Sequence, residues 1–592
     1  MKECLRLATP VLIFLIILCI GFQTREETDT FNIEPPHKVV SYDQLRIVSN
    51  YHGKSATVNG IYNHINTTGD VNGYVDNITR CDYNSLDRFW FSKFYNSNKE
   101  VDQNVPVYSV DNITHANFTR VTVLDKKNVY HLCDRVFVKI EAMDSLNRSK
   151  SYGGDMFRVK LFSGKPYAAV NADHLIDFQN GTYLAIFRIL WEGEIDLQVL
   201  LVHPAEAIPL FLPTIKGGRS VKALYKGGFE TKDDTGKMHQ EVTTCTIYER
   251  EKPFCNFSDN QIYAPWFCSS PKDNLLNCSH WKTHATDKAA IQKLLQAELD
   301  QTAEEILKRS KSLVYRSKGL ITVQQRDNST TAHYAEIAGS MLPYCKPEGP
   351  PPIKTNGYFF QNIWYPLNCR IKHFSKEDIL ECLNGKTVRI FGDSTSRQVY
   401  EVLQKFLKCK SIPLDPPRNS SRLDCRCRIN NVTLHFQFHG LPTKGSNVSP
   451  ISGIHYAAND IDRLEGGPGT IIFLSYWAHF TMTGMDFYKK RLESVRDALD
   501  RLLARSPPGT KIYMKGANTR NYSVKTYQLI SSDWIALQFE FVLRELYKDY
   551  KEFGFIDTWD ITQVQPFPDN VHPKAPIISN YIDRLMTYTC ET

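Results

Sequence analysis

Two short motifs, far apart in the chain, carry the residue types of a serine-based acyl-transfer site. The first is Gly392-Asp393-Ser394, and the second is the Asp-x-x-His sequence that runs from Asp569 to His572. A serine hydroxyl is a poor nucleophile until a histidine takes its proton and a carboxylate holds that histidine in the right tautomer. We therefore predict that Ser394 is the nucleophile, that His572 is the base, and that Asp569 orients His572 through Nδ1.

The surroundings of the first motif favour catalysis over an ordinary turn. Gly-Asp-Ser alone arises by chance, but here an apolar run, 387–391, precedes it and a helix-compatible stretch, 398–403, follows it. This order predicts a nucleophile between a strand and a helix. The pattern is not Gly-x-Ser-x-Gly, which disfavours the usual α/β-hydrolase elbow.

Length and charge place the chain among multidomain globular proteins. Its 592 residues, 42% of them hydrophobic, predict two to four domains. The net charge of +7 comes from 71 basic and 64 acidic residues that are well interspersed. Without a block of Lys and Arg to follow a phosphate backbone, nucleic acid is not expected as a partner.

The N-terminus, 1–22, has the pattern of a secretory signal peptide or a signal-anchor. An uncharged run, 7–22, follows a short charged start and precedes polar residues. The run is shorter than the roughly 20 residues that span a bilayer. We therefore favour cleavage and secretion, with an uncleaved type II anchor and a Golgi-luminal protein as the alternative.

Sequons and cysteines behind such a segment indicate a glycosylated, disulfide-bonded protein. Thirteen cysteines remain after Cys4 and Cys19, and the odd number leaves one unpaired or intermolecular. Cys425-Arg426-Cys427 could suggest zinc, but its spacing is too short for the usual ligand pair, so no metal is predicted. The predicted glycosylation sites are Asn66, Asn77, Asn112, Asn117, Asn147, Asn180, Asn256, Asn277, Asn328, Asn419, Asn431, Asn447 and Asn521.

The first half of the chain predicts a β-sandwich followed by a connecting region. After a glycosylated extension, 23–117, apolar and polar residues alternate over 118–205, which indicates half-buried antiparallel strands in a sandwich of immunoglobulin-like size. The next segment, 206–345, is rich in cysteine and then helical. We expect disulfide-stapled loops between Cys245 and Cys278 and one amphipathic helix over 287–312.

A Pro-rich stretch, 346–354, marks the expected boundary to a last domain, 355–592. There the pattern changes to short apolar strands that alternate with helices, which predicts a parallel sheet flanked by helices. Sites in such folds gather at the carboxyl ends of strands, where Ser394 would lie. The predicted strands are 387–391, 470–474, 511–515 and 553–556, and the predicted helices lie around 492–503 and 534–547.

With these residues, the chain resembles the neurexophilin and PC-esterase domain family, written NXPE. The resemblance rests on 144–148 before 152–155, on Trp364-Tyr365-Pro366 with Cys369, on 383–386, on Gly392-Asp393-Ser394 with Arg397 and Gln398, and on the Asp-x-x-His motif. It implies an immunoglobulin-like sandwich of the neurexophilin or filamin type, followed by a PC-esterase domain, which is a branch of the SGNH hydrolase-like enzymes.

Families similar in the last domain include plant polysaccharide O-acetyltransferases and the luminal domain of a sialate O-acetyltransferase. The resemblance therefore implies an acyl-enzyme on Ser394, from which a glycan hydroxyl or water takes the acyl group. It implies no bound cofactor, but a transferase would need an acetyl donor such as acetyl-CoA.

The oxyanion formed on such a site needs two or three hydrogen-bond donors. The backbone N–H of Ser394 is one, and Gly516 and Asn518, after the third strand, are candidates for the others. Trp477 is a candidate to stack on a sugar or to lie in the core, and His479 a candidate for the site or for a structural role. Arg397 and Gln398 are candidates for substrate contact or site support.

Two function classes follow. The favoured one is a secretory-pathway O-acetyltransferase, with an O-acyl esterase next, acting on secreted or cell-surface glycans. The alternative is a secreted neurexophilin-like protein that binds a cell-surface receptor and carries a catalytically silent esterase domain.

Overall fold

The computed structural model describes residues 109–590 except 218, 220–224, 250–252, 325–332, 339–341, 414–421, 444–447, 523 and 551–552. All of these residues belong to one compact unit, 50–592. The predicted signal, most of the N-terminal extension and the sequons at Asn66, Asn77, Asn328, Asn419 and Asn447 lie outside the described residues. Within the described part, the strands form four sheets.

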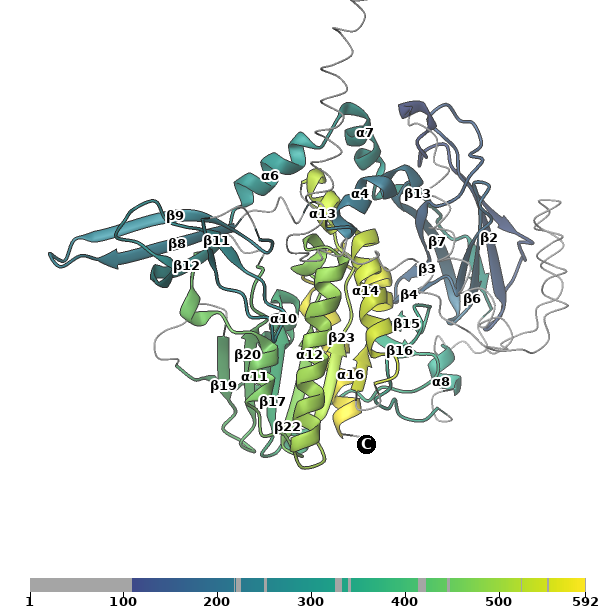
Figure 1. Ribbon diagram of the computed structural model, residues 1–592. Coiled ribbons are helices and arrows are strands. Elements are labelled where there is room, and N and C mark those ends of the chain that lie inside the picture. Colours follow the sequence, from purple (N-terminus) through teal and green to yellow (C-terminus); the bar gives the residue numbers. More distant parts are fainter. Residues whose placement is uncertain are drawn as a thin grey trace, which may run out of the picture. The chain divides into compact units, whose positions relative to one another are not determined.

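Two antiparallel sheets pack face to face in the first half of the described chain (Figure 1). The smaller sheet has the order β1-β2-β6-β5. Alternate residues such as Val138 and Ile140 on β2 face Val159 and Leu161 on β3 of the other sheet, and all four are buried. This period of two is the pattern that the sequence predicts. The bounds are β1 Arg120–Leu124, β2 Arg135–Glu141, β5 His174–Asp177 and β6 Thr182–Arg188.

The larger sheet extends beyond the predicted range 118–205. Its order is β13-β7-β3-β4-β15-β16, with β14 also paired to β7. Strands β13 and β14 come from the connecting region, and β15 and β16 follow the Pro-rich stretch. The chain therefore returns to the sandwich after 346–354, because β15 pairs with β4. The bounds are β3 Met156–Gly164, β4 Tyr167–Asn171, β7 Gly193–His203, β13 Ser312–Arg316, β14 Ile321–Val323, β15 Gly357–Phe360 and β16 Ile363–Pro366.

The cysteine-dense segment forms a sheet, so the prediction of stapled loops is wrong in its secondary structure. The order is β10-β11-β9-β8-β12-β21, and Cys245–Cys268 and Cys255–Cys278 cross-link neighbouring parts of it. The predicted helix over 287–312 is divided in two, because Asp300 caps a new helix N-terminus. The bounds are β8 Tyr225–Lys232, β9 Met238–Thr246, β10 Phe254–Asn256, β11 Phe267–Ser269, β12 Trp281–Thr286, β21 Ser449–Pro450, α6 Lys288–Ala297 and α7 Gln301–Arg309.

The last sheet is mixed and carries the first motif. Its order is β18-β19-β20-β17-β22-β23-β24, with parallel pairing from β20 to β24 and antiparallel pairing at the β18 end. The four predicted strands are confirmed as β17, β22, β23 and β24. The bounds are β17 Thr387–Gly392, β18 Lys410–Ser411, β19 Arg422–Arg426, β20 Thr433–Phe438, β22 Thr470–Ser475, β23 Lys511–Lys515 and β24 Phe553–Ile556.

Helices cover both faces of the mixed sheet. Apolar residues of α12 and α14 pack with Ile472 and Ile512 on one face, and those of α10 and α16 pack with Ile471 and Tyr513 on the other. Strands buried on both faces read as continuous apolar runs, as the sequence indicated. The bounds are α4 Ile208–Ile215, α8 Tyr334–Ala338, α9 Lys376–Cys382, α10 Ser394–Leu407, α11 Ala457–Asp462, α12 Met485–Arg505, α13 Gln528–Ser531, α14 Asp533–Tyr547, α15 Trp559–Val564 and α16 Ala575–Cys590, with 3-10 helices at η3 Val110–Asn112, η4 Ala205–Ala207, η5 Cys278–His280, η6 Ile451–Gly453, η7 Phe480–Met482 and η8 Lys525–Tyr527.

Further disulfides lie outside the cysteine-dense sheet. Further pairs join Cys345 to Cys369, Cys382 to Cys590 and Cys409 to Cys427, and Cys133 is disulfide-bonded as well. Cys427 is therefore not available as a zinc ligand, and the buried Cys425 is the free thiol among the described residues. Such bonds fit folding in the oxidising secretory pathway. Across the described ranges, no helix has the length and apolar character to cross a membrane.

Candidate active site

The structure brings Ser394 and His572 into direct contact. The Nε2 atom of His572 lies 2.7 Å from Oγ of Ser394. Ser394 is the first residue of α10, immediately after the carboxyl end of β17, and it is half-buried, while His572 is exposed. The two motifs, 178 residues apart, therefore meet at an edge that a substrate can reach.

A short strand-to-helix turn holds the serine in place. Gly392 has a φ of +145°, and a Cβ at this position would lie 2.1 Å from the carbonyl oxygen of Ser475, so glycine is required there. The fully buried carboxylate of Asp393 then accepts the backbone N–H of Thr395 and that of Ala478, both at 2.8 Å. Asp393 thus caps α10 and fixes the turn to the loop after β22. The N–H groups of the first helical turn favour negative charge near Ser394.

Two amide side chains position the loop that carries His572. Gln398 Nε2 donates to the Pro573 carbonyl at 3.0 Å, and Asn518 Nδ2 donates to the Val571 carbonyl at 3.1 Å. These carbonyls belong to the residues on either side of His572. Gln398, predicted as a substrate or support residue, therefore supports the imidazole from α10.

The predicted oxyanion role of Gly516 and Asn518 does not fit their contacts. The N–H of Gly516 donates to the Ile556 carbonyl at 3.1 Å, as part of the link between β23 and β24. The Asn518 amide is engaged by Val571, and its Oδ1 accepts Lys515 Nζ at 2.8 Å. Both groups are used within the fold, because the loop after β23 is packed beneath the His572 loop. Among the described residues, the backbone N–H of Ser394 has no protein acceptor.

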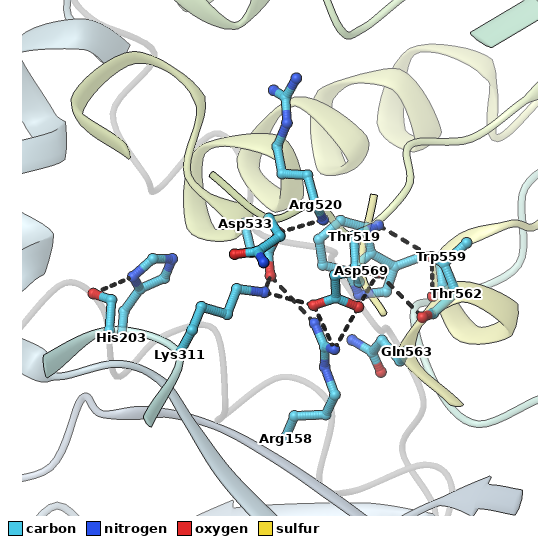
Figure 2. A network of polar contacts seen from close by, with 12 residues as sticks. Arg158, His203, Lys311, Thr519, Arg520, Asp533, Trp559, Thr562, Gln563 and Asp569 are labelled. Atoms are coloured by element: carbon cyan, nitrogen blue, oxygen red, sulfur yellow. Dashed lines mark hydrogen bonds and ion pairs between the residues drawn. The ribbon is translucent and has the colours of Figure 1, made fainter. Parts of the chain in front are cut away.

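Among the described residues, no hydrogen bond or ion pair joins Asp569 to His572, so the predicted contact with Nδ1 is corrected. Its two carboxylate oxygens accept Arg158 Nη1 at 3.0 and 2.9 Å, and they also accept Lys311 Nζ at 2.9 Å and Thr519 Oγ1 at 3.1 Å (Figure 2). Burial opposes ionisation of this carboxyl, but Arg158 and Lys311 outweigh it and lower its pKa. The three-residue spacing would allow Asp569 to pair with the His572 imidazole. The carboxylate instead pairs with Arg158 and Lys311, two cations that are far away in the sequence.

These contacts belong to an ion cluster of Arg158, Lys311, Asp533 and Asp569. Arg158 Nη2 lies 3.2 Å from Asp533, and Lys311 also pairs with Asp533. Arg158 lies on β3 of the sandwich and Lys311 precedes β13, whereas Asp533 begins α14 beside the mixed sheet. The cluster therefore fixes the Asp-x-x-His segment to the sandwich.

Electrostatics keep the candidate base neutral. Although His572 reaches the surface, partial burial of its imidazole lowers its pKa, and Arg397 and Arg520 lower that pKa further, against the opposing effects of Asp393 and Glu401. An imidazole with a lowered pKa is uncharged at neutral pH and can accept the Ser394 proton.

The remaining predicted site residues, Trp477, His479 and Arg397, contact other residues of the fold. Trp477 is only 1% exposed, so it belongs to the core and cannot stack on a sugar from solvent. Its Nε1 lies 3.3 Å from Thr395 Oγ1. The half-buried His479 lies with Nδ1 3.1 Å from Nε2 of the buried His439. Arg397 forms an ion pair with Glu401 at 3.3 Å, one turn along α10.

Comparison with known protein families agrees with this division of the chain. Residues 364–590 match the family model described as NXPE family member 4-like, C-terminal domain, and residues 96–302 match the family model described as Neurexophilin. The chain belongs to the NXPE family.

In this NXPE-family protein, the C-terminal match contains the mixed sheet and both motifs. The neurexophilin match contains Arg158, which binds Asp569 in the other match. Strands β13, β14 and β15 lie between the two matches, although they complete the larger sheet of the sandwich.

Sequence reasoning missed Arg158, Lys311, Asp533 and Arg520. None lies in a motif, and Arg158 is 411 residues from Asp569, so no local pattern pointed to them. It also missed Gly440, which follows β20. The His439 N–H donates to the Gly392 carbonyl at 3.2 Å, which brings Gly440 near the serine turn of this NXPE-family protein.

Proposed function

We propose that this protein is a serine-dependent acyl-transfer enzyme of the secretory pathway that acts on glycan hydroxyls. O-acetyl transfer is favoured over ester hydrolysis. The observation that carries the proposal is the 2.7 Å contact between Ser394 Oγ and His572 Nε2 at the accessible N-terminus of α10. A serine and a neutral imidazole in this geometry are what nucleophilic acyl chemistry requires.

The reaction would proceed through an acyl-enzyme. Ser394 Oγ attacks the donor carbonyl carbon while its proton passes to His572 Nε2, and the carbonyl electrons move to oxygen. Collapse of this intermediate expels the leaving group, which takes the proton from His572. A sugar hydroxyl then attacks the acyl-serine, giving its proton to His572, and Ser394 recovers its hydrogen when the ester is released.

The oxyanion would lie at the start of α10. The Ser394 N–H and the helix N-terminus supply one donor and a favourable dipole. We propose the Gly440 N–H as the second donor, because the His439 N–H bond to the Gly392 carbonyl places Gly440 next to the serine turn, and the chain leaves the strand conformation at Gly440, where φ is +91°. A single well-placed donor stabilises such an intermediate by roughly 3 to 4 kcal/mol.

The sandwich is proposed to be immunoglobulin-like and the mixed-sheet unit to be an SGNH-like PC-esterase domain. The described sequons are exposed, apart from the half-buried Asn112, which supports glycosylation during secretion. The acyl donor, such as acetyl-CoA, would be a co-substrate, and cell-surface or secreted glycans would be the acceptors.

Mass spectrometry of glycan O-acetylation tests the proposal. Cells would express the protein or Ser394→Ala at matched levels, with sialylated glycans included among the classes measured. Ser579→Ala is a matched control, because Ser579 is an exposed serine on α16 of the same unit. We expect the protein to raise O-acetylation and Ser394→Ala to lose at least about 10³-fold of this activity while secretion is retained.

The direction of the change separates the variants of the proposal. A Ser394-dependent fall in O-acetylation would support serine acyl chemistry as hydrolysis instead of transfer. The absence of any Ser394-dependent change in every glycan class would refute the enzyme and favour the receptor-binding alternative.

A further inference from the structure

Arg520 is a buried arginine whose guanidinium has no hydrogen-bond acceptor and no carboxylate partner among the described residues. The residue is 8% exposed, and its Nη1 atom is fully buried without a hydrogen bond. Among the described residues, its guanidinium makes no hydrogen bond and no ion pair. Burial of a charge is costly unless the charge is paired and hydrogen-bonded. Arg520 therefore needs an explanation that the fold alone does not supply.

The other buried arginines of the described chain have protein acceptors. Arg188 pairs with Asp173, Arg219 with Glu298, and Arg544 with Glu540 and Asp557. Arg491 donates to the carbonyls of Tyr263 and Leu441, and Arg584 donates to Tyr588. Arg520 differs from all of these.

The unpaired guanidinium lies beside the candidate active site. Its Cζ is 5.1 Å from the ring centroid of Trp477, whose Nε1 contacts Thr395, the residue after Ser394. Its charge also contributes to the lowered pKa of His572. The side chain points away from the ion cluster, although its backbone N–H donates to Asp533 at 2.9 Å (Figure 2).

This placement suits a single anionic group on a bound substrate. A guanidinium presents a planar fork that matches a carboxylate, with two parallel N–H donors. A donor with several phosphates would call for several free cations, but the nearby Arg397 is paired with Glu401 and Lys515 donates to Asn518 and the Gly516 carbonyl. The stack on Trp477 holds the guanidinium ready, so that little side-chain entropy is lost on binding.

We propose that Arg520 binds the carboxylate of an acidic sugar, so that the preferred acceptors are carboxylate-bearing glycans. This inference rests on the proposed function for the identity of the acceptor. It adds a substrate-recognition residue that sits outside both sequence motifs. The expected advantage of a charge-assisted pair is roughly 10- to 100-fold in affinity.

Binding to the full chain in the Ser394→Ala background tests the inference without turnover. The probes are the methyl glycosides of glucuronic acid and of N-acetylneuraminic acid, each compared with its own carboxamide, by saturation-transfer NMR titration. At least one acid should bind about tenfold or more tightly than its carboxamide. Arg520→Met should bring that ratio near one, and Arg520→Lys should retain part of it, because the charge remains and the fork is lost.

Controls make each outcome decisive. Arg463→Gln removes one positive charge from an exposed side chain and should leave the ratio unchanged. Equal binding of acid and carboxamide, or a preference that survives Arg520→Met, would overturn the inference. Loss of coenzyme A binding instead of sugar binding in Arg520→Met would overturn it in favour of a phosphate contact. If Arg520→Met does not fold, Arg520→Lys decides through the same ratio.

The inference and the proposed function can fail separately. A carboxylate preference without any Ser394-dependent change in O-acetylation would support acidic-glycan binding and reject the enzyme. Ser394-dependent acyl transfer without a preference for the acid over its carboxamide would support the enzyme and reject Arg520 as a carboxylate-binding residue.

Discussion

Buried arginine has opposite roles in the ion cluster and at the edge of the mixed sheet where Ser394 and His572 meet, here called the serine edge. Arg158 in the cluster has two carboxylates, Asp533 and Asp569, and holds the sandwich against the Asp-x-x-His segment. Arg520 near the serine edge has no hydrogen-bond acceptor or carboxylate partner among the described residues, and it lies against Trp477. A satisfied buried charge specifies how elements pack, whereas an unsatisfied one is costly to the fold and available to a ligand.

The two residues of the Asp-x-x-His motif also have different contacts. Asp569 has the spacing of a catalytic carboxylate, yet its contacts make it part of the packing between the sandwich and the mixed-sheet unit. His572 is supported instead by Gln398 and Asn518 through the backbone. The motif thus contributes His572 to the candidate catalytic pair and Asp569 to the packing between the sandwich and the mixed-sheet unit.

Arg158→Met should give the largest effect on stability. It leaves Asp533 and Asp569 with Lys311 as their shared cation, and removal of one partner from a buried pair costs roughly 3–5 kcal/mol. Thermal unfolding of the purified protein measures this loss as a lower Tm. Arg520→Met is the matched control and should change the unfolding free energy by at most about 1 kcal/mol, because no protein acceptor is lost. Equal losses in the two variants would remove the distinction between the regions.

Asn518→Ala should have an intermediate effect, chiefly on activity. It removes the hydrogen bond to the Val571 carbonyl and one acceptor of the buried Lys515, a loss of about 1–3 kcal/mol. We expect roughly a tenfold lower kcat with a smaller change in KM, because misplacement of His572 affects proton transfer more than binding. Steady-state kinetics and Tm should be measured together. A fall in Tm with unchanged kcat would show that Asn518 only stabilises the fold.

The pH dependence should give the smallest effect and the finest test of Arg520. Catalysis needs neutral His572, so the rate falls as pH drops below its pKa. Arg520 and Arg397 lower this pKa, while Asp393 and Glu401 raise it. Arg520→Met should therefore raise the pKa and move the acid limb of kcat/KM to higher pH. Arg463→Gln should leave the limb in place, and a shift to lower pH in Arg520→Met would contradict this electrostatic placement.

Much of the mixed sheet could be predicted, because its strands are marked locally. Runs such as 471–474 are apolar throughout, as expected of strands buried on both faces, and this run forms the centre of β22. The cysteine-dense sheet was missed because cysteine spacing indicates cross-links without indicating strand pairing. The sandwich was underestimated because β15 pairs with β4 across nearly 190 residues.

The amino-acid sequence by itself indicated Ser394 and His572, the pair proposed as nucleophile and base, and it predicted the strand-to-helix turn between β17 and α10. These depend on residue type and on neighbours within a few positions, as with Gly392 and Asp393. Only the tertiary structure decided that Asp569 binds Arg158, that Asn518 supports the His572 loop, and that the Arg520 guanidinium has no hydrogen-bond acceptor among the described residues. Electrostatic pairing depends on distance in space and on burial, and neither is written in local sequence spacing.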